Sequence, residues 1–222
     1  MVLMAETIAV TACALAVIRF LHAHGAAGFQ WIAVPSVLVA AALVPAWVSR
    51  REFPRIGLDL GHIGVVTGTL GCVCVCVFPA VFFGLWMVTR LNLPVPLQPV
   101  IPGRQGWLAW LLYQFFYVAV AEELFFRGYV QANAMRLVGI QGGVGRVAGP
   151  RIKTIIPILV SGGCFALAHV VVQGQIIAVL TFLPGVILAW LFLRTGTLLA
   201  PILFHGLANV SYALMAMALA RP

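Results

Sequence analysis

Charged side chains are scarce in this sequence. Only 8% of its 222 residues are Asp, Glu, Lys or Arg, whereas a soluble domain carries about 25%. Hydrophobic residues make up 63% of the chain and the mean hydropathy is +1.10, so no water-exposed surface can be built from this composition. The scarcity excludes a soluble globular protein and predicts a polytopic membrane protein that forms one integral membrane domain over residues 1–222.

A basic arm for nucleic acid is also missing, although the formal net charge is +8. The basic residues lie between apolar runs, as membrane topology requires. We therefore expect the lipid bilayer, and no nucleic acid, as the partner of this charge. No Lys or Arg precedes Arg19, and no small-x-small cleavage site follows the first apolar run. This run is therefore expected to be a retained helix rather than a signal peptide.

The five cysteines form no disulfide pattern. Cys72, Cys74 and Cys76 alternate along one apolar run, where helical side chains two positions apart point about 200° away from each other. Three thiols arranged in this way cannot converge on one metal ion, so we expect them to be small packing residues.

Long apolar runs define the expected fold, because about twenty apolar residues cross a bilayer as a helix. Gly128–Thr154 is the longest interruption between runs, with an amphipathic extension that could form an eighth helix and a Gly-rich loop that could face substrate. The expected fold class is all-α, a transmembrane bundle of about seven to eight helices. The seven predicted spans are Ala5–Leu21, Phe29–Val48, Ile63–Val88, Trp107–Phe126, Ile155–Val172, Ile176–Leu193 and Leu198–Leu219.

The basic residues indicate an orientation, because cytoplasmic loops carry an excess of Lys and Arg. If Ser49–Arg55 is cytoplasmic, nine of the thirteen basic residues lie on that side. The N-terminus is then predicted to be cytoplasmic.

A stripe of glycines leads into the third run. Spacings of 4, 3, 4 and 3 residues leave one helical face without side chains, where another helix can approach closely. We expect a packing role for these residues, which are Gly57, Gly61, Gly64, Gly68 and Gly71.

Acidic residues number five in the whole chain, and two of them, Glu122 and Glu123, stand side by side inside the fourth run. A charge within a membrane span is costly, so the pair is a functional-site hypothesis. Arg127 follows Glu123 by four residues, which predicts an ion pair on one helical face. Glu122 has Phe126 at the same offset and must therefore find its partner on another helix.

Three more polar side chains lie in apolar runs. His169 is in the fifth run, whereas His205 and Asn209 lie four residues apart in the seventh run and share a helical face. Because isolated polar groups are unfavourable in lipid, we expect them to converge on the acidic pair in a membrane-embedded polar active site. Taken singly, each could also serve helix packing alone.

These groups suit hydrolysis at a carbonyl carbon. A desolvated Glu122 can act as general base toward water, and His169 can share that water and later protonate a leaving amine. His205 and the Asn209 amide can donate hydrogen bonds to the oxyanion that develops on the carbonyl.

Other hydrolytic chemistries find less support. Ser161 and Ser211 lack an elbow motif or a paired base. Two His and one Glu could ligate zinc, but the chain has no HExxH motif and the histidines come from different runs. We therefore expect no metal and no cofactor, and a zinc-dependent protease is a less favoured alternative.

Three motifs in fixed order resemble those of one family. EELFFRG at Glu122–Gly128 resembles the EExxxR motif of the CAAX-protease and bacteriocin-processing family of intramembrane proteases. Phe165–His169 and His205–Asn209 resemble its FxxxH and HxxxN motifs, and Leu193–Ile202 also looks like the family. The resemblance covers residues 107–212, which we take as the catalytic core.

The resemblance implies a glutamic endopeptidase. Two residues would activate water and two would form the oxyanion site, namely Glu122 with His169 and His205 with Asn209. The supporting residues would be Glu123, Arg127 and Phe165. Members of the family trim prenylated CAAX tails or process peptides, and others resemble sorting enzymes that cut near a C-terminal membrane anchor.

A sorting or peptide-maturation role is our preferred expectation, because a compact chain resembles prokaryotic members and bacteria mostly lack protein prenylation. The expected substrate is a membrane-anchored protein or peptide, the subtype is myxosortase-like, and the location is the bacterial inner (cytoplasmic) membrane. Two further alternatives stay open, a non-catalytic scaffold or bacteriocin-immunity-type protein and a small transporter with a proton relay. No inverted repeat supports the transporter.

The depth of the site requires a longer fourth helix than its apolar run indicates. With the runs as given, Glu122 lies near the cytoplasmic end of one span and His169 near the far end of the next, so the two cannot touch. A helix that continues to about Arg136 brings Glu122 to mid-membrane. The segment Trp107–Leu137 has 31 residues, which span about 46 Å and can cross with tilt.

Overall fold

The computed structural model describes residues 1–25, 27–54, 63–93, 106–140 and 151–219. Within these residues the fold is all-α and contains no strand, as predicted, and seven helical units are long and apolar enough to cross a membrane. The units are α1 (Val2–His24), α2 (Ala27–Val48), α3 (Ile63–Arg90), a central helix (Trp107–Leu137), α7 (Arg151–Gln173), η4 with α8 (Ile176–Thr181 and Phe182–Thr195) and α9 (Leu199–Leu219).

The seven predicted spans are confirmed, and outside the fourth span their ends differ from the observed ones by at most four residues. The predicted end of the fourth span at Phe126 is wrong, because the central helix continues to Leu137, as the depth argument required. The helix stops where Gly139 adopts a positive φ of 75°, which glycine reaches without strain. The extension that could have formed an eighth helix is therefore part of the central helix. Apart from its first two residues, the predicted Gly-rich loop of residues 139–150 lies outside the described residues.

The central helix changes its winding along its length. Two segments have the wider π-helical winding, a rare geometry that is frequent at functional sites. The acidic pair occupies the single α-helical turn between them. In chain order the segments are α4 (Trp107–Leu112), η2 (Tyr113–Ala119, π), α5 (Val120–Glu123), η3 (Leu124–Gln131, π) and α6 (Ala132–Leu137).

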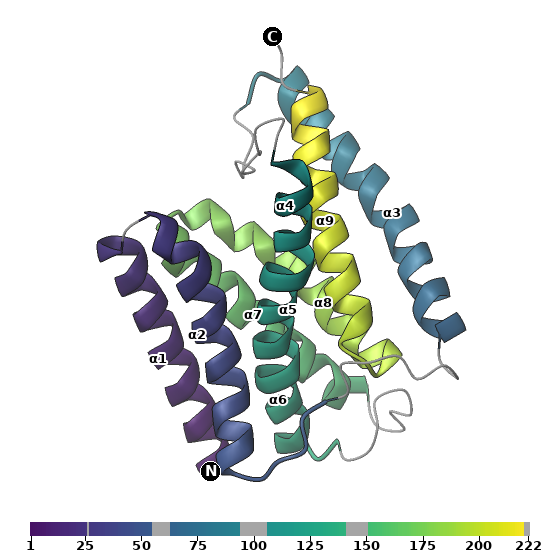
Figure 1. The fold of residues 1–222 in the computed structure, drawn as a ribbon. Helices are drawn as coiled ribbons and strands as arrows, with labels where there is room; N and C mark the ends of the chain where they lie inside the picture. Colours follow the sequence, from purple (N-terminus) through teal and green to yellow (C-terminus); the bar gives the residue numbers. More distant parts are fainter. Residues whose placement is uncertain (26, 55–62, 94–105, 141–150, 220–222) are drawn as a thin grey trace.

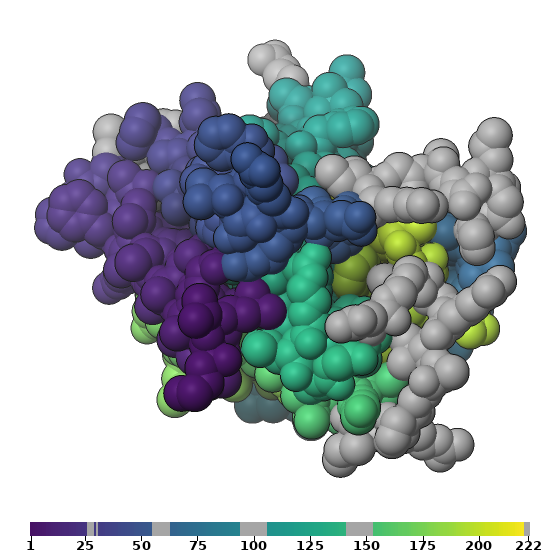
Figure 2. Space-filling view, turned by 90° about the horizontal axis from the view of Figure 1, so that it is seen from below, coloured from purple at the N-terminus to yellow at the C-terminus, as the bar shows by residue number. Residues whose placement is uncertain are grey.

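The other helices surround the central helix. Figure 1 shows α1 and α2 on one side of it, α9 and then α3 on the other, and α7 with α8 behind. Figure 2, seen from below, likewise places α1 and α2 across the central helix from α9. All eight residues of η3 are buried, and they pack against α2 and α7. The core of the molecule therefore lies around η3, next to the acidic pair.

Polar contacts join the C-terminal part of the central helix to the N-terminal part of α1. The Glu6 carboxylate on α1 binds the Arg51 guanidinium, and its Oε1 accepts a hydrogen bond from the Tyr129 hydroxyl at 3.1 Å. The Phe53 ring lies directly against Gly128, which leaves no room for a Cβ atom there. These contacts fix the position of the C-terminal half of the central helix, and with it the position of the site along the bundle.

Helix α3 is the outermost unit, and the packing expected of its glycines is wrong for the described residues. No described atom lies within 4 Å of the position that a Cβ would take at Gly64, Gly68 or Gly71. Gly57 and Gly61 lie outside the described residues. A different face of α3 borders an apolar groove of about 470 Å³ that it shares with α7 and α8. Its lining is Cys72, Val73, Cys76, Val77, Ile155, Ile158, Leu159, Val186, Ile187 and Trp190.

Candidate active site

The predicted ion pair between Glu123 and Arg127 is present and fully buried. Arg127 Nη1 lies 3.0 Å from Glu123 Oε1, and both side chains are 0% exposed. Arg127 Nη2 also donates to the Gly185 carbonyl of α8 at 2.9 Å. One turn further along, Gln131 Nε2 donates to the Ala189 carbonyl at 2.9 Å. The two donors, four residues apart, meet two carbonyls four residues apart, so the central helix is locked to α8 in one register.

Close approach of the helices makes this lock possible. A Cβ at Gly185 would lie 3.2 Å from the Gly162 Cα of α7 and 3.2 Å from the Phe165 ring. Because Gly185 has no side chain, α8 comes near enough for its carbonyl to reach the buried guanidinium. The Ser161 hydroxyl of α7 donates to the Phe126 carbonyl at 3.0 Å. This bond joins α7 to the central helix next to its contact with α8.

His205 joins both members of the acidic pair from α9. Its Nδ1 lies 2.7 Å from Glu123 Oε1, and its Nε2 lies 3.8 Å from Glu122 Oε2. An ionised Glu123 accepts a proton-bearing Nδ1, so the second nitrogen faces Glu122. Glu123 Oε1 thus receives His205 and Arg127 together, while the second nitrogen of His205 lies near Glu122.

Glu122 is the more open of the two carboxylates. Its side chain is 19% exposed, whereas Glu123 is 0% exposed. Its Oε2 is buried and has no hydrogen-bond partner among the described residues. A buried polar atom is normally paired, so an unpaired carboxylate oxygen at a partly open position suits a water molecule or a reacting group.

His169 lies beside this cluster rather than in it. Its Nδ1 is 2.9 Å from the Phe165 carbonyl one turn earlier in α7, which makes Nδ1 the donor and leaves Nε2 with its lone pair. The expected partnership was between Glu122 and His169, but the carboxylate contact in the structure goes to His205. Among the described residues the hydrogen bond of His169 involves Nδ1, so Nε2 can serve as an acceptor for a group brought to the site.

Phe165 connects the two histidines. Its ring centroid is 4.4 Å from that of His169 and 5.8 Å from that of His205. Arg127 Cζ lies 4.7 Å from the same ring, a cation–π distance that favours the charged guanidinium. The predicted supporting residue thus packs against both imidazoles and against the Arg127 guanidinium.

Asn209 lies one turn beyond His205 on α9, as its spacing predicts, but the sequence did not indicate its hydrogen-bond partner. Its Nδ2 donates to Gln114 Oε1 on η2 at 2.9 Å. Gln114, Gln131 and Ser161 are buried polar residues whose roles in this packing the sequence did not reveal. The only signal was a polar residue within a strongly apolar run.

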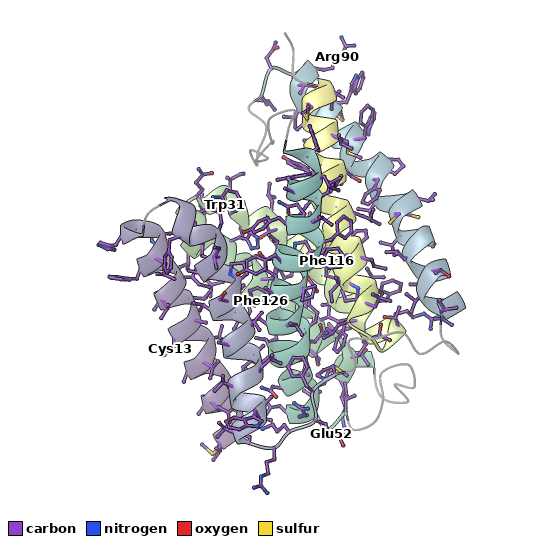
Figure 3. The ribbon with its side chains drawn as sticks, viewed as in Figure 1. Cys13, Trp31, Glu52, Arg90, Phe116 and Phe126 are labelled. Carbon is purple, nitrogen blue, oxygen red and sulfur yellow. The ribbon has the colours of Figure 1, made fainter. Side chains whose placement is uncertain are left out.

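The site lies halfway along the central helix. Glu122 is fifteen residues from Trp107 and fifteen from Leu137. In Figure 3 the neighbouring Phe126 lies near the middle of the molecule, between Glu52 toward one end and Arg90 toward the other. The depth of Glu122 within a bilayer stays a prediction.

The donor set does not resemble a metal centre. Among the described residues, no group of three or more His, Cys, Asp or Glu side chains has an arrangement that could hold a metal ion.

Comparison with known proteins adds one finding. Residues 104–211 match the sequence model of a family described as type II CAAX prenyl endopeptidase Rce1-like. No curated protein and no solved structure matches the chain.

Proposed function

We propose that the chain is a glutamic endopeptidase of the membrane, because residues 104–211 match the type II CAAX prenyl endopeptidase Rce1-like family and seven helical units among the described residues are long and apolar enough to cross a bilayer. In this proposal it hydrolyses one peptide bond of a membrane-anchored protein or peptide, with Glu122 as the residue that activates water.

Glu122 is the proposed base because of its surroundings. It is partly open, its Oε2 lacks a hydrogen-bond partner among the described residues, and it lies in an apolar bundle. A carboxylate with an unpaired oxygen at a partly open position can accept a proton from a water molecule. Glu123 also has an Oε2 without a hydrogen-bond partner among the described residues, but its side chain is fully buried and its Oε1 already serves Arg127 and His205.

His169 is proposed to complete the proton transfers. Its Nδ1 is committed to the Phe165 carbonyl, so its Nε2 is the nitrogen that can pass the proton that Glu122 takes from the water on to the leaving amine. The direct contact of Glu122 is with His205, so the water would bridge Glu122 and His169 rather than follow a direct bond between them.

His205 and Asn209 are proposed as donors to the oxyanion. With Nδ1 bound to Glu123, a protonated His205 presents Nε2–H near Glu122, where a carbonyl under attack would lie. Two carboxylates, one guanidinium and one imidazolium then sum to zero charge, which a medium of low dielectric favours. Preorganised donors of this kind are commonly the largest contribution to such catalysis.

The contact of His205 with both carboxylates is the observation that carries this proposal. The test is turnover by the purified full chain in liposomes on quenched-fluorescent peptides that carry an apolar membrane anchor. We expect Glu122→Gln to lower kcat by about 10²- to 10⁴-fold, the usual contribution of a general base. The matched control is Glu52→Gln, which makes the same change at an exposed carboxylate outside the spans. Undiminished turnover by Glu122→Gln, or no cleavage by the wild-type chain, would contradict the proposal.

The proposed substrate is a protein or peptide with a membrane anchor, in a sorting or maturation role of the myxosortase-like kind. The proposed location is the bacterial inner membrane, with the N-terminus cytoplasmic. Mass spectrometry of products from co-expressed anchored proteins would test this choice. Cleavage of a prenylated CAAX tail in preference to a peptide anchor would overturn it.

A further inference from the structure

Gln114 is a buried amide that the proposed chemistry does not use. It is 9% exposed, lies on η2 two turns before Glu122, and accepts a hydrogen bond from Asn209 Nδ2 at 2.9 Å. An amide in an apolar bundle is costly unless it is paired. The observed pair links the central helix to the proposed oxyanion residue of α9.

Packing beside this bond holds the same turn of α9. A Cβ at Gly206 would collide with the ring of Phe115, the residue that follows Gln114. The backbone between His205 and Asn209 therefore rests directly on η2. Contact at Gly206 fixes where the turn lies, but it does not determine how the Asn209 amide is rotated.

Rotation of the amide decides whether Asn209 can help an oxyanion. The final torsion of an Asn side chain is broad and roughly two-fold, and its oxygen and nitrogen ends are nearly equal in size. Sterics alone therefore leave both orientations available. In one of them the NH₂ group faces the central helix, and in the other the carbonyl oxygen does so and repels a developing negative charge.

We propose that Gln114 is a positioning residue that selects the catalytic orientation of Asn209. Its Oε1 accepts one N–H of the amide, which turns the NH₂ group toward the helix that also carries Glu122. The second N–H of the same group is then available to the oxyanion. This inference rests on the proposed function, because the orientation of Asn209 affects the rate only if Asn209 stabilises the transition state.

The first test replaces Gln114 by residues of similar length. Gln114→Met removes the acceptor and is expected to lower kcat about tenfold, the equivalent of one hydrogen bond, with KM changed less than twofold. Gln114→Glu keeps an acceptor oxygen at the same reach and is expected to restore most of kcat. If Gln114→Met does not accumulate, Gln114→Asn takes its place, because its amide is one methylene too short to reach Asn209.

A double-mutant cycle separates positioning from mere stabilisation. Gln114→Met is expected to cause no further loss of kcat in an Asn209→Ala chain, because the orientation it controls no longer exists. The matched control is Gln131→Met, which removes another buried glutamine bond from the central helix. Its effect on kcat, whatever its size, is expected to combine independently with that of Asn209→Ala.

The outcomes distinguish this inference from the function on which it rests. Full kcat in Asn209→Ala would overturn the oxyanion role itself. A loss in Asn209→Ala together with full kcat in Gln114→Met would overturn only the positioning role. An equal further loss from Gln114→Met in both backgrounds, or no recovery in Gln114→Glu, would also overturn it.

Discussion

At the scale of single residues, the two adjacent glutamates have different roles in the structure. Glu123 is an internal hub, with Arg127 and His205 on one oxygen and no exposure to the surroundings. Glu122 is partly open and keeps an unpaired oxygen. Burial of an ion pair costs much desolvation, so the pair adds little net stability, but the loss of one partner leaves a charge without compensation.

Removal of Arg127 alone should therefore destabilise the protein strongly. We expect Arg127→Met to lower the free energy of unfolding by about 3–5 kcal/mol, because the Glu123 carboxylate stays buried with one partner fewer. The measurement is reversible denaturation of the purified chain in mixed micelles. Arg19→Met, at an exposed arginine of α1, is the control and should change this free energy by less than about 0.5 kcal/mol.

The double variant Glu123→Gln with Arg127→Met sharpens the result. It leaves no buried charge from the pair, so it should be more stable than Arg127→Met alone. A double variant that is less stable by the sum of the two single losses would show that the ion pair is strongly stabilising in itself.

Contacts within one helix could be predicted from the sequence, whereas contacts between helices could not. The offset of four residues was enough to predict the bond between Glu123 and Arg127, because both lie on one helix. His205 could be assigned to the same site only by the need to satisfy polar groups in lipid. Its contact with Glu122, and the bond from Asn209 to Gln114, depend on how α9 packs against the central helix, which no spacing encodes.

At the scale of elements, a proline in α2 explains a contact with the central helix. Pro35 has no N–H, so the Trp31 carbonyl four residues earlier loses its helical donor. The Tyr113 hydroxyl donates to this carbonyl at 2.9 Å. The Tyr117 hydroxyl donates to the next carbonyl, that of Ile32, at 2.7 Å. Two tyrosines thus join α2 to η2 by hydrogen bonds. Tyr113 supplies the donor that Pro35 cannot give to the Trp31 carbonyl.

The effect of Tyr113→Phe should therefore depend on Pro35. We expect this change to cost about 1 kcal/mol of unfolding free energy in the wild-type chain and clearly less with Pro35→Ala, where the alanine N–H serves the Trp31 carbonyl. Tyr117→Phe is the matched control, and its cost should be the same with or without Pro35→Ala. Denaturation curves of the six chains decide this, and equal costs of Tyr113→Phe in both backgrounds would contradict the explanation.

The helices themselves were largely predictable, whereas their winding was not. Hydropathy located seven spans, since apolar length is set by the bilayer. The fourth helix extends past Phe126 into less apolar residues, and only the need to bring Glu122 to the right depth indicated its true length. The π-helical segments around α5 left no mark in the sequence, because their winding reflects how the central helix fits its neighbours.

At the scale of the whole molecule, glycines occur in two opposite settings. Gly206 lies under the Phe115 ring in the centre, whereas Gly68 on the outer helix α3 has no described atom within 4 Å of its missing side chain. The sequence predicted a packing role for the glycines of α3, because small residues permit close approach. A pattern of small residues does not specify the partner, and within the described chain none approaches this face.

Alanine at these two positions should have opposite consequences. Gly206→Ala is expected to lower the unfolding free energy by about 1–3 kcal/mol, since the new methyl group must displace Phe115. Gly68→Ala should change it by less than about 1 kcal/mol, the difference in helix propensity between the two residues. Both are measured by denaturation in the same micelles, and a large loss for Gly68→Ala would reveal a contact with that face.

Glu122 lies equally far from both ends of the central helix. Water, like the peptide substrate, must therefore reach a site deep within the bundle. Fifteen residues of helix correspond to about 22 Å on either side. If Glu122 works as proposed, each turnover consumes a water molecule that has reached a point midway along this helix, far from either end. Entry of water into the bundle would then limit the rate of turnover. Lipids that thicken the bilayer would slow the enzyme although its catalytic residues are unchanged.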